Sequence, residues 1–174
     1  MALMATLPFV KMNGAGNDFV VVNALETPFA PTEAQVRAIA DRETGEGCDQ
    51  LIALEPSETA DVFMRVWNAD GGQVETCGNA LRCVGWLMMQ STGQDRVTID
   101  TLGGPTTAWR AEGENQIRVD MGPPRLDWTQ VPLAEAMDTR NIELQIGPID
   151  DPVLHTPGAV SMGNPHVVFF MDHA

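Results

Sequence analysis

Positive charge is scarce in this sequence. Ten Lys and Arg residues stand against twenty-four Asp and Glu residues, which gives the 174-residue chain a formal net charge of -14. A surplus of negative charge on this scale repels phosphate backbones and anionic membrane surfaces. We therefore expect neither nucleic acid nor a membrane among the partners of this protein.

Long hydrophobic runs are also missing. The longest apolar segments fall far short of the ~20 residues that span a bilayer. The opening MALMATLPFVKMNG has no basic segment ahead of its apolar residues, as a secretory leader would. We expect a cytoplasmic protein. Its 44% content of hydrophobic residues is enough to build a buried core.

Cysteine is rare, with only Cys48, Cys77 and Cys83. Three is an odd number, the spacing fits no metal site, and a chain of this length does not need disulfides for stability. We expect reduced thiols and no bound metal. If residues 77–83 are helical, six residues correspond to about 600° of rotation, which places Cys77 and Cys83 on different faces. We do not expect them to act as a pair.

What the sequence does contain is a series of short strand and helix patterns. Segments rich in Val and aromatic residues predict strands at residues 18–23, 49–55 and 61–69. A helix is predicted between the first two of these, because Thr32 and Gln35 form a capping box and TEAQVRAIADR then places its apolar residues on one face. The glycines of the following TGEG are expected to mark the end of this helix.

A longer helix is predicted for GNALRCVGWLMMQS, residues 78–91, because its apolar residues cover a wide face. Gly93 should close it. Three alternating runs follow, RVTIDTL, TTAWRAEG and QIRVDMG, and the turns between them contain Gly or Asn. This pattern predicts an antiparallel meander.

The Pro-Pro pair in MGPPRLDW marks the best candidate for a domain boundary. We expect one domain over residues 1–123 and the incomplete start of a second over residues 124–174. Strands are predicted in this second part at residues 143–149, 158–162 and 166–172, but no helix follows to cover them.

The stretch NADGGQVETCGNALRC, residues 68–83, places Cys77 directly before the longer helix. Unpaired backbone N–H groups and the positive end of the helix dipole favour thiolate over thiol at such a position. Cys77 is therefore a candidate acid or base. The N–H groups of Gly78 and Asn79 could bind a substrate carboxylate. The alternative is a buried, inert cysteine, and the polar residues on both sides argue against it.

Uncharged amide side chains recur at predicted strand ends. They are Asn17, Gln50, Asn68 and Asn164, each next to Gly or Asp or following a strand. Singly, each is typical of a turn. Together with a helix N-terminus, four such amides suit a zwitterionic substrate with carboxylate and ammonium groups.

The segments KMNGAGNDFVVV, GCDQL, NADGGQVETCGNALRC, QIRVDMG and GAVSMGNPHVV occur in the order of the motifs of diaminopimelate epimerase, which the sequence resembles over nearly its whole length. The resemblance implies an α/β protein of the α+β type, with two pseudo-symmetric domains, each a mixed, largely antiparallel sheet wrapped around a central helix. It also implies one cysteine at a helix N-terminus in each domain. It implies further that one thiolate removes the α-proton of LL-diaminopimelate and a thiol delivers a proton to the opposite face, without pyridoxal phosphate or metal.

Matched motif by motif, the resemblance makes Cys77 one of the two acid/base thiols and gives the α-carboxylate to Gly78 and Asn79. It implies substrate contacts for the four amides and a supporting role at the catalytic centre for His166. For His166 a structural role beside Pro165 is nearly as good an interpretation. We expect structural roles for His155 and His173. We expect Cys48 and Cys83 to be core or supporting residues.

The sequence departs from the family in one respect, since it contains neither an ERGxGET segment nor a second CG helix start. We expect the chain to represent about the first two-thirds of the family and to be inactive alone. We expect the protein to be an epimerase that acts on a small molecule in the biosynthesis of lysine and peptidoglycan precursors. The alternatives are a related cofactor-independent racemase, for example one acting on proline, and a non-catalytic binding module. A homodimer is one possible assembly.

Overall fold

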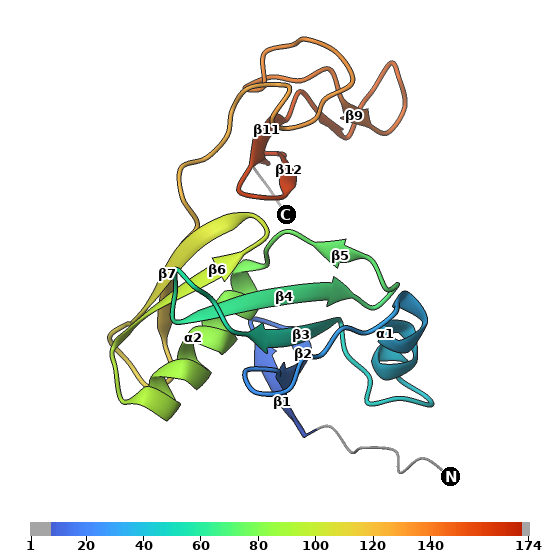
Figure 1. The fold of residues 1–174 in the computed structure, drawn as a ribbon. Coiled ribbons are helices and arrows are strands. Elements are labelled where there is room, and N and C mark those ends of the chain that lie inside the picture. The colour runs from blue at the N-terminus through green and yellow to red at the C-terminus, as the bar shows by residue number, and fades with distance from the viewer. Residues whose placement is uncertain (1–7, 172–174) are drawn as a thin grey trace. The chain divides into compact units, whose positions relative to one another are not determined.

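The computed structural model describes residues 8–171, which divide into two compact units (Figure 1). The first unit ends at Asp120 and the second begins at Met121. Within the described residues, no helix is both long and apolar enough to cross a membrane.

The first unit is built on one mixed sheet. Its strands are β1 (Phe9–Gly14), β2 (Asn17–Asn23), β3 (Gln50–Glu55), β4 (Val62–Asn68), β5 (Gln73–Val74), β6 (Arg96–Thr101), β7 (Gly104–Arg110) and β8 (Ile117–Asp120). They are ordered β1-β2-β3-β4-β6-β7-β8, and β5 pairs with β4. The pairs β2–β3 and β4–β6 are parallel and all other pairs are antiparallel. The predicted mixed, largely antiparallel sheet is confirmed.

Helix α2 (Gly78–Thr92) is the centre of this unit. It contacts β1 at one end of the strand order and β6, β7 and β8 at the other, so the sheet curls around it (Figure 1). Seven of its residues are buried, among them Leu81, Val84 and Met89. A Cβ atom on Gly85 would lie 2.6 Å from the Cβ atom of Ala108, so glycine is what lets the helix approach β7 this closely. Gly93 ends the helix in the left-handed conformation, as predicted.

Helix α1 (Glu33–Ala40) packs on the other face of the sheet. Thr32 caps it and forms the predicted capping box with Gln35. The helix ends at Ala40, before the glycines that were expected to end it, and that prediction is wrong. The cause is Asp41, whose carboxylate accepts hydrogen bonds from the backbone N–H groups of Glu43 and Thr44 at 2.9 and 2.7 Å and so forms a turn.

Strands β2 and β3 are buried on both faces, which explains their continuous apolar sequences. Val20 and Val22 of β2 and Leu51 of β3 belong to a core cluster with Val36 of α1. Phe19 and Ile52, which alternate with these residues, are fully buried as well. A strand covered on both faces has no polar side to show, so it reads as an apolar run instead of an alternating pattern.

The second unit contains four short strands in two small sheets. They are β9 (Gln145–Ile146), β10 (Leu154–His155), β11 (Gly158–Ser161) and β12 (Pro165–Val168), paired as β9–β10 and β11–β12. The strand predicted at residues 143–149 is reduced to β9, because Gly147 adopts a positive φ of 112° and Pro148 follows it. The strand predicted at residues 166–172 is shorter, and Asp172 and His173 lie outside the described residues.

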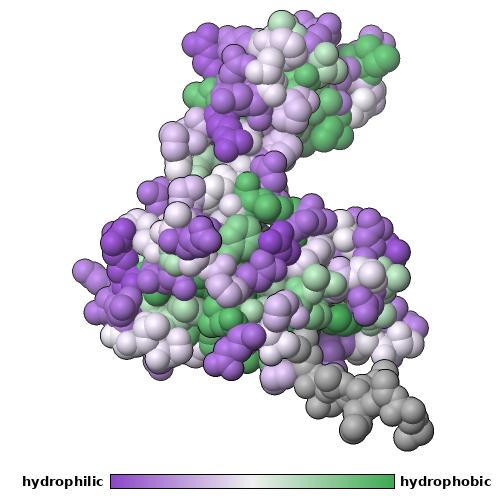
Figure 2. Space-filling model, in the orientation of Figure 1, coloured by the Kyte–Doolittle hydropathy of each residue, from purple (hydrophilic) through white to green (hydrophobic). Residues whose placement is uncertain are grey.

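The core of the second unit is small. Its buried cluster consists of Val131, Ile142 and Ala159. Large hydrophobic side chains remain exposed, including Ile149 and Phe170, which are 85% and 93% exposed. Green hydrophobic areas are visible on this unit in Figure 2. By contrast, the first unit has an extensive core made by both helices and the sheet.

Candidate functional site

Three of the predicted amides lie at one edge of the sheet in the first unit. Asn17 begins β2, Gln50 begins β3, and Asn68 ends β4. Because β2 and β3 are parallel and β4 is antiparallel to β3, the two starts and the one end share an edge. Gln50 and Asn68 are direct partners across the β3–β4 pair, and Nε2 of Gln50 donates to Oδ1 of Asn68 at 2.9 Å.

The first turn of α2 reaches the same edge. Cys77 is the N-cap residue, with an extended backbone at φ -146° and ψ 115°, and its side chain makes no capping hydrogen bond. The backbone O of Cys77 accepts the N–H of Leu81 at 2.9 Å. Two residues on, Nδ2 of Asn79 donates to Oδ1 of Asn17 at 2.7 Å. Six of the eight predicted site residues, including Gly78, therefore lie at this edge of the sheet or in the adjoining start of α2.

The three thiols differ in their surroundings. All are free, but Cys48 and Cys83 are only 1% and 5% exposed, whereas Cys77 is half-buried. Burial raises the pKa of the Cys48 and Cys83 thiols, because it penalises the charged thiolate. Of the core or supporting roles expected for Cys48 and Cys83, their burial fits the first.

We predict that Cys77 is the first thiol to react with an alkylating reagent at neutral pH. It stands at the positive end of a helix and is accessible, whereas burial disfavours the thiolates of the other two. Brief treatment of the folded chain with iodoacetamide, followed by peptide mapping, would measure this. Labelling of Cys48 or Cys83 before Cys77 would contradict the assignment.

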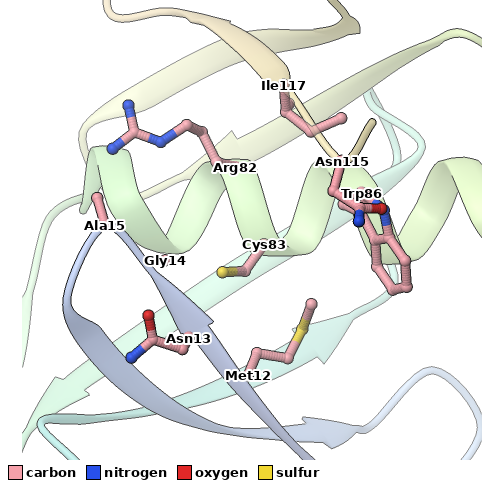
Figure 3. A pocket seen from close by; sticks show the side chains of 9 residues that line it. All are labelled: Met12, Asn13, Gly14, Ala15, Arg82, Cys83, Trp86, Asn115 and Ile117. Atoms are coloured by element: carbon pink, nitrogen blue, oxygen red, sulfur yellow. The ribbon is translucent and has the colours of Figure 1, made fainter. Parts of the chain in front are cut away.

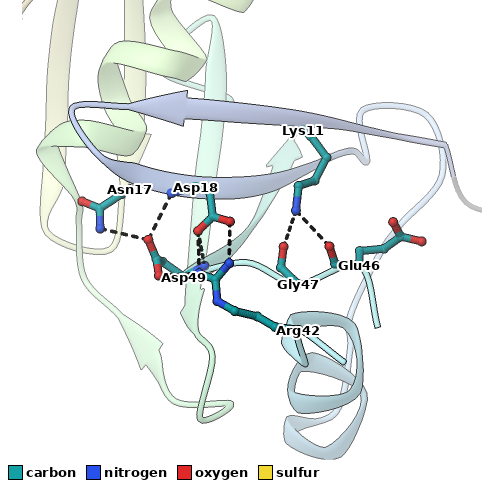
Figure 4. Close-up of polar contacts among 7 residues, drawn as sticks. All are labelled: Lys11, Asn17, Asp18, Arg42, Glu46, Gly47 and Asp49. Carbon is teal, nitrogen blue, oxygen red and sulfur yellow. Dashed lines mark hydrogen bonds and ion pairs between the residues drawn. The ribbon is translucent and has the colours of Figure 1, made fainter. Parts of the chain in front are cut away.

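Charged residues beside the amides form a compact network (Figure 4). Arg42 binds Asp18 through both of its terminal nitrogens, at 2.9 and 2.8 Å, and binds Asp49 at 2.8 Å. The hydrogen bonds from Arg42 hold the pKa of Asp18 well below its usual range. Oδ2 of Asp49 accepts from Nδ2 of Asn17 at 3.2 Å and from the backbone N–H of Asp18 at 3.1 Å. This network joins the start of β2 to the segment that precedes β3.

Asp49 and Arg42 were not predicted to belong to the site. Asp49 stands directly before Gln50 in GCDQL, but nothing in the pattern shows that its carboxylate turns toward Asn17. Its partner Arg42 follows the end of α1, and their pairing depends on the early end of that helix.

A pocket of about 380 Å³ opens beside α2 (Figure 3). Residues 12–15 of the β1–β2 hairpin, three side chains of α2 and two residues in or next to β8 line it. The α2 side chains are Arg82, Cys83 and Trp86, and Nε1 of Trp86 donates to Oδ1 of Asn115 at 2.9 Å. None of the eight predicted site residues lines this pocket, but Arg82 in its wall donates a hydrogen bond to Asn79, so the pocket adjoins the predicted substrate site.

The other two predicted residues belong to the second unit. Asn164 lies in the turn between β11 and β12, and His166 lies in β12. Both are exposed, and Nδ1 of His166 is 2.9 Å from the backbone O of Asn164. Their roles stay predictions. Across residues 8–171, no group of three or more His, Cys, Asp and Glu side chains could hold a metal ion.

The fold, a curled mixed sheet around a helix, is similar to that of two solved structures. A hydroxyproline epimerase from Agrobacterium vitis has a TM-score of 0.65 at 14% identity, covering 97% of this chain and 53% of that one. A predicted epimerase from Pseudomonas aeruginosa has a TM-score of 0.62 at 16% identity, covering 94% of this chain and 59% of that one. At such identities the likeness establishes the fold alone.

The chain belongs to the diaminopimelate epimerase family, because the model of that family matches residues 9–126. The diaminopimelate epimerase of Phenylobacterium zucineum is 59% identical over 167 residues, which cover 96% of this chain and 60% of the relative. That of Caulobacter vibrioides is 56% identical over 171 residues, which cover 94% and 59%. The chain thus spans about three-fifths of the length of these curated relatives.

Proposed function

We propose that the whole protein converts LL-diaminopimelate to meso-diaminopimelate by proton transfer between carbon and two thiols. Cys77 is the thiol contributed by this chain. Membership of the family supports the proposal, as does the position of six predicted residues at one sheet edge and the adjoining start of α2. As thiolate, Cys77 takes the α-proton from one face, and a second thiol donates a proton to the other face, which inverts the stereocentre.

One observation carries the substrate class. Oε1 of Gln50 is buried and has no hydrogen-bond partner among the described residues. Such an acceptor costs free energy unless a ligand supplies a donor. An ammonium group has three N–H donors and no acceptor, so it can supply the donor that this oxygen lacks. At the same edge of the sheet, the N–H groups in the first turn of α2 favour an anion such as a carboxylate. A zwitterionic amino acid meets both requirements.

The proposed reaction needs a reduced Cys77, because a disulfide sulfur carries no proton and cannot act as an acid or a base. All three cysteines of the chain are free. We place the enzyme in the cytoplasm, where thiols stay reduced and precursors of lysine and peptidoglycan are made. The substrate in this proposal is a small molecule, and nucleic acid has no part in it.

Asn68→Ala should weaken the binding of diaminopimelate by roughly one to two decades. The variant would leave the substrate group that Asn68 contacts buried without a hydrogen-bond partner, which costs ~1–3 kcal/mol. The Michaelis constant, measured in a form that spans the full length of the relatives, would show this. Asn23→Ala is the matched control, since Asn23 is an exposed amide at the opposite end of β2. Equal Michaelis constants for the two variants would remove Asn68 from the site.

The same protein should bind diaminopimelate in calorimetry and should not bind proline. Binding of proline alone would favour a proline-type racemase. Binding of diaminopimelate without turnover would favour a non-catalytic binding module.

A further inference from the structure

Three hydrogen bonds connect Arg82 of α2 to Asp49 through two amide side chains. A terminal nitrogen of Arg82 donates to Oδ1 of Asn79. Nδ2 of Asn79 donates to Oδ1 of Asn17 at 2.7 Å, and Nδ2 of Asn17 donates to Oδ2 of Asp49 at 3.2 Å. The series therefore runs in one direction, from a cation at one end to a carboxylate at the other.

The two ends of this series differ from its middle in a decisive way. A guanidinium has only donors and an ionised carboxylate has only acceptors, whereas an amide has both and can be turned over. Turning Asn17 over would set its oxygen against the carboxylate of Asp49 and its NH₂ group against that of Asn79. Turning Asn79 over would set its NH₂ group against Arg82. Only one of the four combined orientations of the two amides makes all three bonds.

The two ends of the series differ in their other contacts. Asp49 is fixed by Arg42, which donates to its Oδ1 at 2.8 Å, and by the backbone N–H of Asp18 on Oδ2 at 3.1 Å. Arg82 stands on α2, three residues after Asn79, and its side chain lies at the pocket beside the tip of the β1–β2 hairpin (Figure 3). Within the described residues, no carboxylate forms an ion pair with Arg82. Its charge is therefore available to the amide of Asn79.

We propose that Arg82 and Asp49 are positioning residues, which fix the amide orientations of Asn79 and Asn17 for the substrate. In the enforced orientation each NH₂ group keeps one N–H that no described residue accepts. These two N–H groups are donors for an anionic substrate group such as a carboxylate. The reversed orientation would present oxygen to that group and repel it. The benefit to binding rests on the proposed function, but the orientation itself does not.

The orientation can be tested on this chain without substrate, through the side-chain amide signals in ¹H–¹⁵N NMR spectra. Arg82→Met should shift the signals of Asn79 and also of Asn17, although Arg82 does not bond to Asn17. Arg82→Lys keeps a donor and should bring the Asn17 signal back toward its original position. Arg118→Met, an exposed cation of β8, is the control and should move neither signal. A shift confined to Asn79 would overturn the proposal.

Kinetics of a form that spans the length of the relatives give the second test. Arg82→Met and Asp49→Asn should each raise the Michaelis constant for diaminopimelate about ten-fold, with little change in kcat, because each frees the amides to turn over. Asp49→Asn cannot serve both neighbours, since one half of its amide must face Arg42 and the other the donors of Asn17 and Asp18. Asp100→Asn is the control, because this carboxylate bonds Ser57 and Thr59 elsewhere on the sheet.

The double variant separates a connected series from two local effects. If the amides act as one series, losing the second end adds little, and the double variant should lose clearly less than the product of the single losses. Losses that multiply in full would overturn the proposal. If the unaltered enzyme neither binds nor converts diaminopimelate, the proposed function is refuted. The NMR shifts would still decide the orientation of the amides.

Discussion

Cys77→Ala should lower kcat/KM for the epimerisation of diaminopimelate by at least about 10²–10⁴-fold, the usual contribution of one positioned acid or base. The loss should apply in both directions of the reaction, because in the proposed mechanism the same sulfur takes the proton in one direction and returns it in the other. The side chain of Cys77 makes no capping hydrogen bond, so replacing it with a methyl group removes no hydrogen bond from α2. The variant should therefore keep the circular dichroism spectrum of the parent enzyme.

Cys83→Ala is the matched control, since Cys83 stands on the same helix but is buried against Gly14 at the pocket. Its loss should change kcat/KM by less than ten-fold, because no role in proton transfer is assigned to it. A Cys77→Ala enzyme with activity within ten-fold of the parent would show that another group performs the proton transfer.

Leu81→Ala should lower the free energy of unfolding of the first unit by about 2–5 kcal/mol. Leu81 is 1% exposed and lies on the helix around which the sheet curls, so the surrounding side chains cannot close the cavity fully. Urea unfolding followed by far-ultraviolet circular dichroism would measure the change. Gln90→Ala on the exposed face of α2 is the control and should stay within about 0.5 kcal/mol of the parent. A loss below about 1 kcal/mol for Leu81→Ala would contradict a central position for α2.

Local signals in the sequence account for much of the first unit. The capping box of Thr32 and Gln35, the wide apolar face of α2 and the glycine at position 93 each depend on neighbours within one or two helical turns, and each is confirmed. The early end of α1 was not predicted, because it depends on the carboxylate of Asp41 folding back on the next residues. In the sequence, the two glycines of TGEG are a stronger signal for a helix end than Asp41, but the helix ends at Ala40, directly before Asp41.

The candidate site shows where sequence reasoning ends. Each amide could be placed at a strand end, but their meeting depends on the parallel pairing of β2 with β3, a long-range choice. Asp49 and Arg82, which bond to Asn17 and Asn79, lie within recognisable motifs, but the sequence alone indicates no role for them. In the second unit, β9 and β10 are two residues long, too short to show a period.

Exchange of the α-proton with solvent tests the central claim most directly. A form that spans the length of the relatives would be incubated with LL-diaminopimelate in D₂O, while the α-proton signal and the formation of the meso isomer are followed by NMR. Proton transfer through thiols predicts that the signal disappears as deuterated meso product forms, and that Cys77→Ala slows product formation by at least about 10²–10⁴-fold. Failure of the parent enzyme to form meso product, or product formed at an unchanged rate by Cys77→Ala, would contradict the claim.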